Sequence, residues 1–189
     1  MGGKKPFIKA LDYFFEHDLY TAGNQIDLQA PFLFNIAGAP WLTQKWAHKI
    51  TTEPIIQKYG THQLFPEPVY GRVFKTTPDG MLEEMDDDFA CMSAWFALSG
   101  MGLYQVCPGI PEFELFSPIF RKIVLDIPGN STFTIEAKNY APDCYYIQSA
   151  MLNGKPHDKC TISYKEIMAG GKLEYVMGKQ PNKSWGLER

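Results

Sequence analysis

Residues 78–101 read Pro78-Asp-Gly-Met-Leu-Glu-Glu-Met-Asp-Asp-Asp-Phe-Ala-Cys-Met-Ser-Ala-Trp-Phe-Ala-Leu-Ser-Gly-Met101 and place an acidic run directly before an apolar one. Six carboxylates fall between Asp79 and Asp88, with no Lys or Arg among them. Their mutual repulsion favours a bound cation, a raised carboxyl pKa or full solvation. From residue 89 to residue 101 only two serines and one glycine interrupt the apolar sequence. This pattern predicts a helix buried on all sides, with acidic residues at its N-terminus, where the helix dipole favours anions.

The acidic run has two explanations, and its residues alone leave both open. Calcium and other hard cations bind through clustered oxygen ligands, so the run is a candidate metal site. An Asp run before a helix is also typical of an N-cap followed by solvated acidic side chains.

Composition narrows the class of protein. The chain has 189 residues, of which 45% are hydrophobic and 21% charged, as in ordinary globular proteins of one or two small domains. The net charge of −3 and the dispersed basic residues argue against a nucleic-acid partner. No apolar run reaches the ~20 residues that span a bilayer, and residues 1–7 lack the apolar core of a signal peptide. The four cysteines lack Cys-x-x-Cys spacing, which favours buried thiols over a zinc site.

The first half of the chain has mainly helical periodicity. Pro6 is suited to the first turn of a helix that should end near His17 or Asp18. Residues 59–75, rich in Gly and Pro, predict an irregular loop. The other predicted helices are a short one over 30–37, one over 41–58 that Pro54 should kink or interrupt, and the apolar one, continuing to about Tyr104.

The second half changes to a period of two, which is typical of strands. Asn153-Gly154 is a strong hairpin signal, and Ser163 with Glu166 predicts a capping box. The sequence therefore predicts an α+β protein with a helical half at 1–105 and a β-rich half at 106–189. The predicted strands are residues 123–127, 132–137, 145–152 and 172–177, with a further segment at 160–163 after the hairpin.

Ten short segments occur in the order found in one enzyme family. Each is weak alone, but together they cover nearly the whole chain, which resembles the C-terminal quarter of glycoside hydrolase family 92, the exo-acting α-mannosidases. The segments are Gly23-Asn-Gln25, Pro31-Phe-Leu-Phe-Asn-Ile-Ala-Gly-Ala-Pro-Trp-Leu-Thr-Gln44, Thr77-Pro-Asp-Gly80, Met85-Asp-Asp-Asp88, Met92-Ser-Ala-Trp95, Gly102-Leu-Tyr-Gln-Val-Cys-Pro-Gly109, Ser117-Pro-Ile-Phe120, Tyr146-Ile-Gln-Ser-Ala150, Leu152-Asn-Gly-Lys-Pro156 and Met177-Gly-Lys-Gln-Pro-Asn-Lys-Ser-Trp-Gly186.

The resemblance implies a fold and a set of site residues. The family is known for an N-terminal β-sandwich, an (α/α)6 barrel and calcium-dependent hydrolysis with inversion, so residues 1–105 would be barrel helices. Its acidic-x-Asp element supplies the general base, here Asp86 and Asp88. Its Gly-Asn-Glu element contributes to the calcium site, here Asn24 and Gln25, with Asp88 as a further ligand. Gln25 replaces a carboxylate by an amide, so calcium binding should be weak.

The family's general acid precedes its Gly-Asn-Glu element. The resemblance therefore implies a fragment or truncated form of the enzyme that is inactive alone and whose substrate would be a mannosyl glycan. The alternatives are a non-catalytic carbohydrate- or calcium-binding remnant and a purely structural one. Trp41 and Trp95 lie among apolar residues and are expected in the core rather than against a sugar.

An incomplete barrel would also leave apolar helix faces uncovered. This predicts a homo-oligomer, most simply a dimer, or association with the N-terminal portion of such an enzyme. Family members are often exported by bacteria, which by resemblance suggests a periplasmic or secreted protein.

Overall fold

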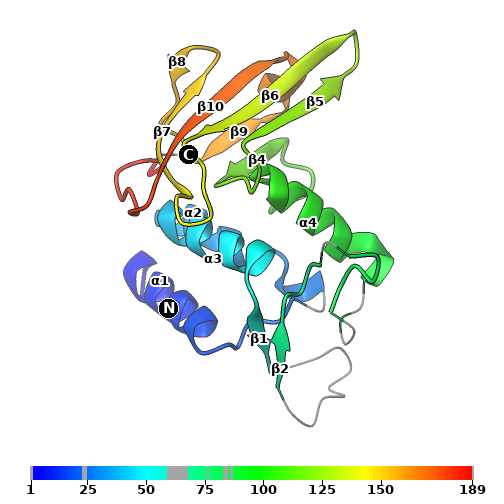
Figure 1. Cartoon of the computed structure of the whole chain (residues 1–189). Helices are drawn as coiled ribbons and strands as arrows, with labels where there is room; N and C mark the ends of the chain where they lie inside the picture. Colours follow the sequence, from blue (N-terminus) through cyan, green and yellow to red (C-terminus); the bar gives the residue numbers. More distant parts are fainter. Residues whose placement is uncertain are drawn as a thin grey trace.

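The computed structural model describes residues 2–22, 25–58, 68–75, 77–82, 85 and 87–188. The helices pack together, and the two larger β-sheets lie on one side of them (Figure 1). Helical elements dominate the chain up to α4, and most strands follow it. The predicted α+β class and the order of helical half and β-rich half are therefore confirmed. The boundary between residues 105 and 106 stays a prediction.

Helices α1 (Lys4–Glu16), α2 (Leu33–Ala37) and α3 (Pro40–Thr52) begin close to where the sequence placed them. Pro6 lies in the first turn of α1, as predicted. Gly38 adopts a left-handed conformation, with φ of 85°, that ends α2 and allows Pro40 to start α3 at once. The rings of Phe15 and Trp46 stack with centroids 4.9 Å apart and join α1 to α3.

Helix α3 is interrupted just before Pro54, as predicted, but the helical pattern does not resume, because residues 55–57 form a strand. Helix α3 ends at Thr52 and Glu53 is extended, because Pro54 has no amide hydrogen and disfavours helical geometry in the residue before it. Strand β1 (Ile55–Gln57) comes next and pairs antiparallel with β2 (Val69–Gly71). The predicted loop over 59–75 thus contains a strand, and its residues 59–67 lie outside the described residues.

The apolar helix is buried on one side only, which corrects the expectation of burial all round. Helix α4 (Cys91–Met101) buries Met92, Trp95, Ser99 and Gly100, whereas Ser93, Ala94 and Ala97 are exposed. It also ends before Tyr104, because Gly102 takes a left-handed conformation with φ of 77°. A Cβ on Gly102 would lie 2.5 Å from the carbonyl oxygen of Phe116, so only glycine fits there.

Two sheets and a short helix form the β-rich half. The larger sheet has the order β5-β6-β10-β7-β8 and the smaller the order β3-β4-β9. Strand β10 pairs parallel with β6 and antiparallel with β7. The bounds are β3 Leu103–Tyr104, β4 Glu112–Leu115, β5 Lys122–Ile127, β6 Ser131–Lys138, β7 Tyr146–Leu152, β8 Lys155–Pro156, β9 Thr161–Ser163, α5 Tyr164–Met168 and β10 Gly171–Gly178.

The predictions for the β-rich half agree closely with the structure. Every predicted strand is present, and the Asn153-Gly154 turn joins β7 to β8 as a hairpin. The capping box is also present, since Glu166 N–H donates to Ser163 Oγ and Ser163 N–H donates to Glu166 Oε2. The sequence analysis missed β3 and β4, and also the short strand β8, since it placed the segment after the hairpin at 160–163, where β9 lies.

Buried polar contacts tie the helices to the sheets. Asn35 Nδ2 donates to Glu114 Oε2 and to the carbonyl oxygen of Leu115, both at 3.1 Å. Gln44 Oε1 accepts from the main-chain N–H of Ile147 at 2.8 Å. Such hydrogen bonds fix the relative position of the elements that they join. A buried donor or acceptor that loses its hydrogen-bond partner costs free energy of folding.

His48, on α3, makes the packing of this helix against Tyr145 sensitive to pH. Its ring is 3% exposed and stacks on Tyr145 with centroids 3.9 Å apart. Burial lowers the pKa of His48 from 6.5 to about 4, although a hydrogen bond with the Pro142 main chain opposes the shift. The charged form is therefore disfavoured in the folded protein.

We expect stability to fall as the pH drops below 6.5. Above that pH the His48 ring is neutral in both states, whereas between pH 6.5 and 4 only the unfolded state takes up the proton. Between pH 7 and 5 the loss should be about 2 kcal/mol. Urea unfolding across this range should show it, and His48→Gln should show a smaller loss. The exposed His17 serves as control, and a His17→Gln variant should match the wild type. Equal slopes for wild type and His48→Gln would contradict the assignment.

Candidate functional site

Two neighbouring carboxylates of the acidic run, Asp87 and Asp88, have different surroundings. Asp87 Oδ1 accepts from the main-chain N–H groups of Met92 and Ser93, at 3.0 and 3.1 Å, and its Oδ2 accepts from Ser93 Oγ. These bonds occupy donors that every helix leaves free at its N-terminus. They also hold the pKa of Asp87 below its ordinary value, with the Ser93 hydroxyl as the largest cause. Asp87 is therefore the cap of α4.

Asp88 begins a short 3-10 helix, η4 (Asp88–Ala90), in a strained stretch of chain. Phe89 and Ala90 both have left-handed backbones, with φ of 50° and 61°, which residues other than Gly, Asn and Asp seldom adopt. The N–H of Ala90 donates to the carbonyl oxygen of Asp87 at 3.0 Å and holds this turn. The Phe89 side chain is fully exposed. Backbone strain of this kind is frequent at functional sites.

The two predicted base residues are placed differently. Asp88 is partly exposed, and within the described part of the chain its carboxylate accepts no hydrogen bond. Its oxygens are thus accessible to water or to a cation. Asp86 lies outside the described residues.

The second candidate element is the turn that contains Gln25. Gln25 is exposed to solvent and begins a 3-10 helix, η1 (Gln25–Asp27). Asn24 lies outside the described residues. Before this turn, Gln57 Oε1 accepts from Ala22 N–H at 2.8 Å and from Thr21 Oγ1 at 3.2 Å. The sequence analysis missed Gln57, because residue 57 fell within the predicted third helix and an isolated glutamine carries no motif.

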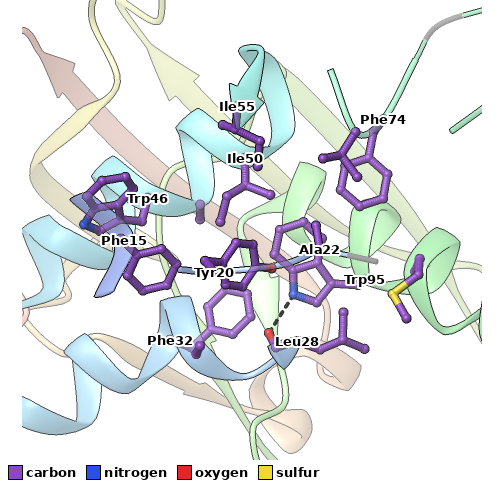
Figure 2. Close-up of a cluster of buried hydrophobic side chains, with 14 of the residues drawn as sticks. Phe15, Tyr20, Ala22, Leu28, Phe32, Trp46, Ile50, Ile55, Phe74 and Trp95 are labelled. Atoms are coloured by element: carbon purple, nitrogen blue, oxygen red, sulfur yellow. Dashed lines mark hydrogen bonds between the residues drawn. The ribbon is translucent and has the colours of Figure 1, made fainter. Parts of the chain in front are cut away.

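After the turn, the indole of Trp95 reaches the same segment. Trp95 Nε1 donates to the carbonyl oxygen of Leu28 at 2.8 Å, as the dashed line in Figure 2 shows. Trp95 belongs to α4, the helix that directly follows η4 and Asp88 in the chain. The segment that follows the Gln25 turn therefore packs against α4, the helix that follows the acidic run.

Asp27 borders the same turn and is half-buried. Its Oδ2 accepts from Thr21 N–H at 3.4 Å, and burial raises the pKa of its carboxyl group. The side chain thus favours the protonated form more than an exposed aspartate does.

The predicted ligands have the chemistry that calcium requires. Gln25 offers an amide oxygen and Asp88 a carboxylate, and neither side chain bonds to another group within the described ranges. Such oxygens are the usual ligands of calcium. Among the described residues no group of three or more His, Cys, Asp or Glu is arranged around a common metal position. The donors that the structure describes fit calcium by type but are too few to form a complete site.

The aromatic and cysteine predictions have mixed outcomes. Trp95 is 1% exposed and packs between Phe32 and Phe74, so its expected place in the core is confirmed (Figure 2). Trp41 is partly buried, with Lys183 Nζ 5.7 Å from the ring centroid. The four cysteines all lie among the described residues and form no disulfide there. Cys160 is buried, as expected, whereas Cys91 and Cys144 are only partly buried and Cys107 is exposed. None of the described helices has the length and hydropathy to cross a bilayer.

Comparison of the chain with known proteins finds similar members of one enzyme family. Residues 1–179 match the glycosyl hydrolase family 92 catalytic domain. Among solved structures, ccman5, a family 92 glycosyl hydrolase, is 33% identical over 99% of this chain, with a TM-score of 0.91. A family 92 α-mannosidase from Bacteroides thetaiotaomicron is 28% identical over 98% of the chain, with a TM-score of 0.80. A family 92 inverting mannosidase from the same organism is 26% identical over 100% of the chain, with a TM-score of 0.76.

The match covers only part of each relative. The chain spans 27%, 23% and 26% of the lengths of these three proteins, in the same order. Each of these matches covers at least 98% of this chain, and the family match covers all but its last ten residues. The chain therefore belongs to glycosyl hydrolase family 92.

Proposed function

We propose that this chain supplies the general base and part of the calcium site of an exo-acting, inverting α-mannosidase. One observation carries the proposal: in a family 92 chain, the Asp87 cap uses one carboxylate of the acidic run and leaves Asp88 accessible at the start of α4. The solved relatives that are α-mannosidases and inverting mannosidases support the choice of substrate and of stereochemistry.

In this mechanism Asp88, together with Asp86, removes a proton from the water that attacks the anomeric carbon. Inversion requires the base and the general acid to lie on opposite faces of the sugar, roughly 6.5 to 9.5 Å apart, so that water fits between. By resemblance the acid belongs to a segment that precedes Asn24 in the family. Residues 1–189 would then hold the water-activating half of the site.

Asn24, Gln25 and Asp88 are the proposed calcium ligands. Bound calcium would hold vicinal hydroxyls of the mannose ring and favour its distortion. Calcium takes six to eight oxygen ligands, so the positions left open by these three residues must go to water or substrate. The amide of Gln25 removes one negative charge from the set, which weakens the attraction to the cation.

The replacement of a carboxylate by Gln25 also favours a second candidate. A chain with lowered calcium affinity and without the general acid could bind a carbohydrate or a cation without hydrolysing it. The two candidates differ in whether Asp88 changes turnover or only binding.

We expect the chain alone to release no mannose from an α-mannoside, because proton donation and sugar positioning are both missing. In a complete family 92 enzyme that contains this segment, Asp88→Asn and Asp86→Asn should lower kcat by about 10²- to 10⁴-fold, since the water loses its base. Steady-state release of mannose is the measurement.

Asp87→Asn provides a matched control, because it makes the same substitution one position away. An asparagine oxygen still accepts from the N–H groups of Met92 and Ser93, so kcat should stay within a few-fold of the wild type. Wild-type turnover in both the Asp86 and Asp88 variants would remove the base assignment. Turnover by the chain alone, lost in Asp88→Asn, would place the acid within residues 1–189.

We expect calcium to bind this chain weakly, with a Kd of about 10⁻³ M or above, because few protein ligands are present. In an amide NMR titration with calcium chloride, the resonances of Gln25 and Asp88 should shift and approach saturation only at millimolar concentration. Asp88→Asn should weaken the response. An unchanged spectrum, with the same melting temperature in chelator, would favour the solvated acidic run.

We also propose that the chain associates with itself through its helical half. Phe7, Leu11 and Phe14 of α1 line an open apolar groove with Leu33, of about 320 Å³. Apolar surface of this kind is seldom left uncovered on a monomer. A two-fold dimer would bury it against a second copy.

Light scattering at micromolar concentration should give a dimer, with an interface above ~2,000 Å². Leu11→Glu should shift the equilibrium towards monomer, because it places a charge in the groove. Tyr13→Glu, on an exposed part of the same helix, should leave the dimer intact. A wild-type monomer that unfolds cooperatively would overturn the self-association.

A further inference from the structure

We propose that the edge strand β5 pairs with β5 of a second copy of this chain, antiparallel about a two-fold axis through Val124. The larger sheets of the two copies would then continue into one another. This contact is separate from the groove on α1, because α1 and β5 lie at opposite ends of the molecule (Figure 1). It also uses no residue of the proposed mannosidase site.

Strand β5 forms a long edge of the larger sheet. It has six residues, and among the described strands it pairs only with β6. The opposite edge of the sheet, β8, has two residues, one of which is Pro156 with no amide hydrogen. Short strands and prolines prevent unwanted pairing at sheet edges, and β5 has neither feature. Its main chain is therefore available to a further strand.

The register with β6 shows which main-chain groups of β5 point outward. Just before the strand, the N–H of Ala137 donates to the carbonyl oxygen of Arg121 at 2.9 Å. Antiparallel pairs alternate between bonded and non-bonded residues, so every second residue from Ile123 onward also bonds to β6. The residues between them direct their N–H and C=O groups outward, where the described part of the chain offers no main-chain partner. These residues are Lys122, Val124 and Asp126.

The side chains of the same three residues are complementary to themselves. All three are exposed, with Val124 at 49%, and the two charges lie two positions on either side of it. Pairing centred on Val124 places Lys122 opposite the partner's Asp126, and Asp126 opposite the partner's Lys122. A lysine alone protects an edge strand against pairing, but an opposite charge directly across from it stabilises the pair. Each opposed pair can also exchange two main-chain hydrogen bonds.

Charge selects this register over the neighbouring ones. Moving the centre by two residues would place Lys122 opposite the partner's Lys122, or Asp126 opposite the partner's Asp126, which is destabilising. Moving it by one residue would place Val124 opposite a charged side chain and leave that charge without a counterpart. The strand is thus matched to itself in one antiparallel register.

The size of the contact sets the concentration at which it forms. Pairing of two six-residue strands should bury less than ~1,200 Å², which is the range of transient contacts. We therefore expect association through β5 at concentrations of about 10⁻⁴ M and above. The proposed contact through the α1 groove would already form at micromolar concentration.

The experiment uses the full 189-residue chain with Leu11→Glu, so that the α1 groove does not contribute. Sedimentation velocity and amide exchange are measured at micromolar and at millimolar concentration. We expect a dimer only at the higher concentration. There the N–H groups of Lys122, Val124 and Asp126 should exchange several-fold more slowly, whereas the N–H groups of the residues between them, which bond to β6, should keep their rates.

Charge reversal in this background provides matched variants. Lys122→Glu and Asp126→Lys, each alone, should abolish the dimer, because like charges then oppose each other across the two-fold axis. A mixture of the two variants should form a heterodimer, since each supplies the charge that the other lacks. Lys122 also lies opposite Glu136 of β6, so its reversal weakens the sheet within one chain as well, and the mixture separates the two effects. Lys155→Glu, the same change on β8, should leave the dimer unchanged.

The outcomes separate this contact from the others. A Leu11→Glu chain that stays monomeric at millimolar concentration would overturn the pairing, and so would a dimer that persists in both charge-reversal variants. A mixture that stays monomeric would overturn the antiparallel register. A micromolar dimer in the Leu11→Glu chain would overturn the α1 contact instead, and the charge variants would still decide the β5 contact.

A main-chain variant gives the answer if a charge variant does not fold. Val124→Pro removes an outward N–H that β6 does not use, which an edge strand tolerates. It should abolish the dimer, whereas Val124→Thr, which keeps the N–H, should retain it. Equal association of these two variants would overturn the pairing of the main chains.

Discussion

The hydrogen bonds of the Asp87 carboxylate fix the start of α4, and with it the arrangement of the acidic run. Two main-chain N–H groups and a serine hydroxyl converge on one side chain, which satisfies the helix terminus and lowers the pKa of the carboxyl group. The next residues must then pass through two consecutive left-handed conformations, at Phe89 and Ala90. A run of similar carboxylates is in this way divided into one that stabilises the fold and a neighbour that remains accessible.

Local sequence patterns predict those elements whose stability is local. The strands of the larger sheet alternate apolar and polar residues, the Asn153-Gly154 turn fixes a hairpin, and Ser163 with Glu166 caps α5. Pro54 is recognisable as a helix breaker, but strand β1 after it is not recognisable, because it is three residues long and is stabilised by pairing with β2, twelve residues later. The short strand β4 escapes prediction for a similar reason, since its partner β3 is only two residues long and its other partner, β9, comes much later in the sequence.

The candidate site was only partly accessible to such reasoning. Motif resemblance located the Gln25 turn and the acidic run, whereas the difference in role between Asp87 and Asp88 depends on which carboxylate meets the free N–H groups of α4. Gln57 could not be found from the sequence, because its role comes from a contact with Ala22, 35 residues earlier. Burial was also misjudged: an apolar sequence predicted a helix covered on all sides, yet α4 presents small residues, among them Ala97, to solvent. Sequence hydrophobicity reports what a helix can bury, and only the neighbouring elements decide how much of it is buried.

The position of β10 in the larger sheet has a consequence for how the chain is made. This strand is the central one of five, it comes after all the others in sequence, and it alone bridges β6 to β7. During synthesis the β5–β6 hairpin and the β7–β8 hairpin emerge from the ribosome well before it, each with an unpaired edge next to the vacant central position. Single helices such as α1 and α3 can form while translation continues, because their hydrogen bonds are local. Folding of the sheet must instead wait until residues 171–178 have left the exit tunnel, and until then the open edges of β6 and β7 are the part of the nascent chain most exposed to mispairing and to chaperones.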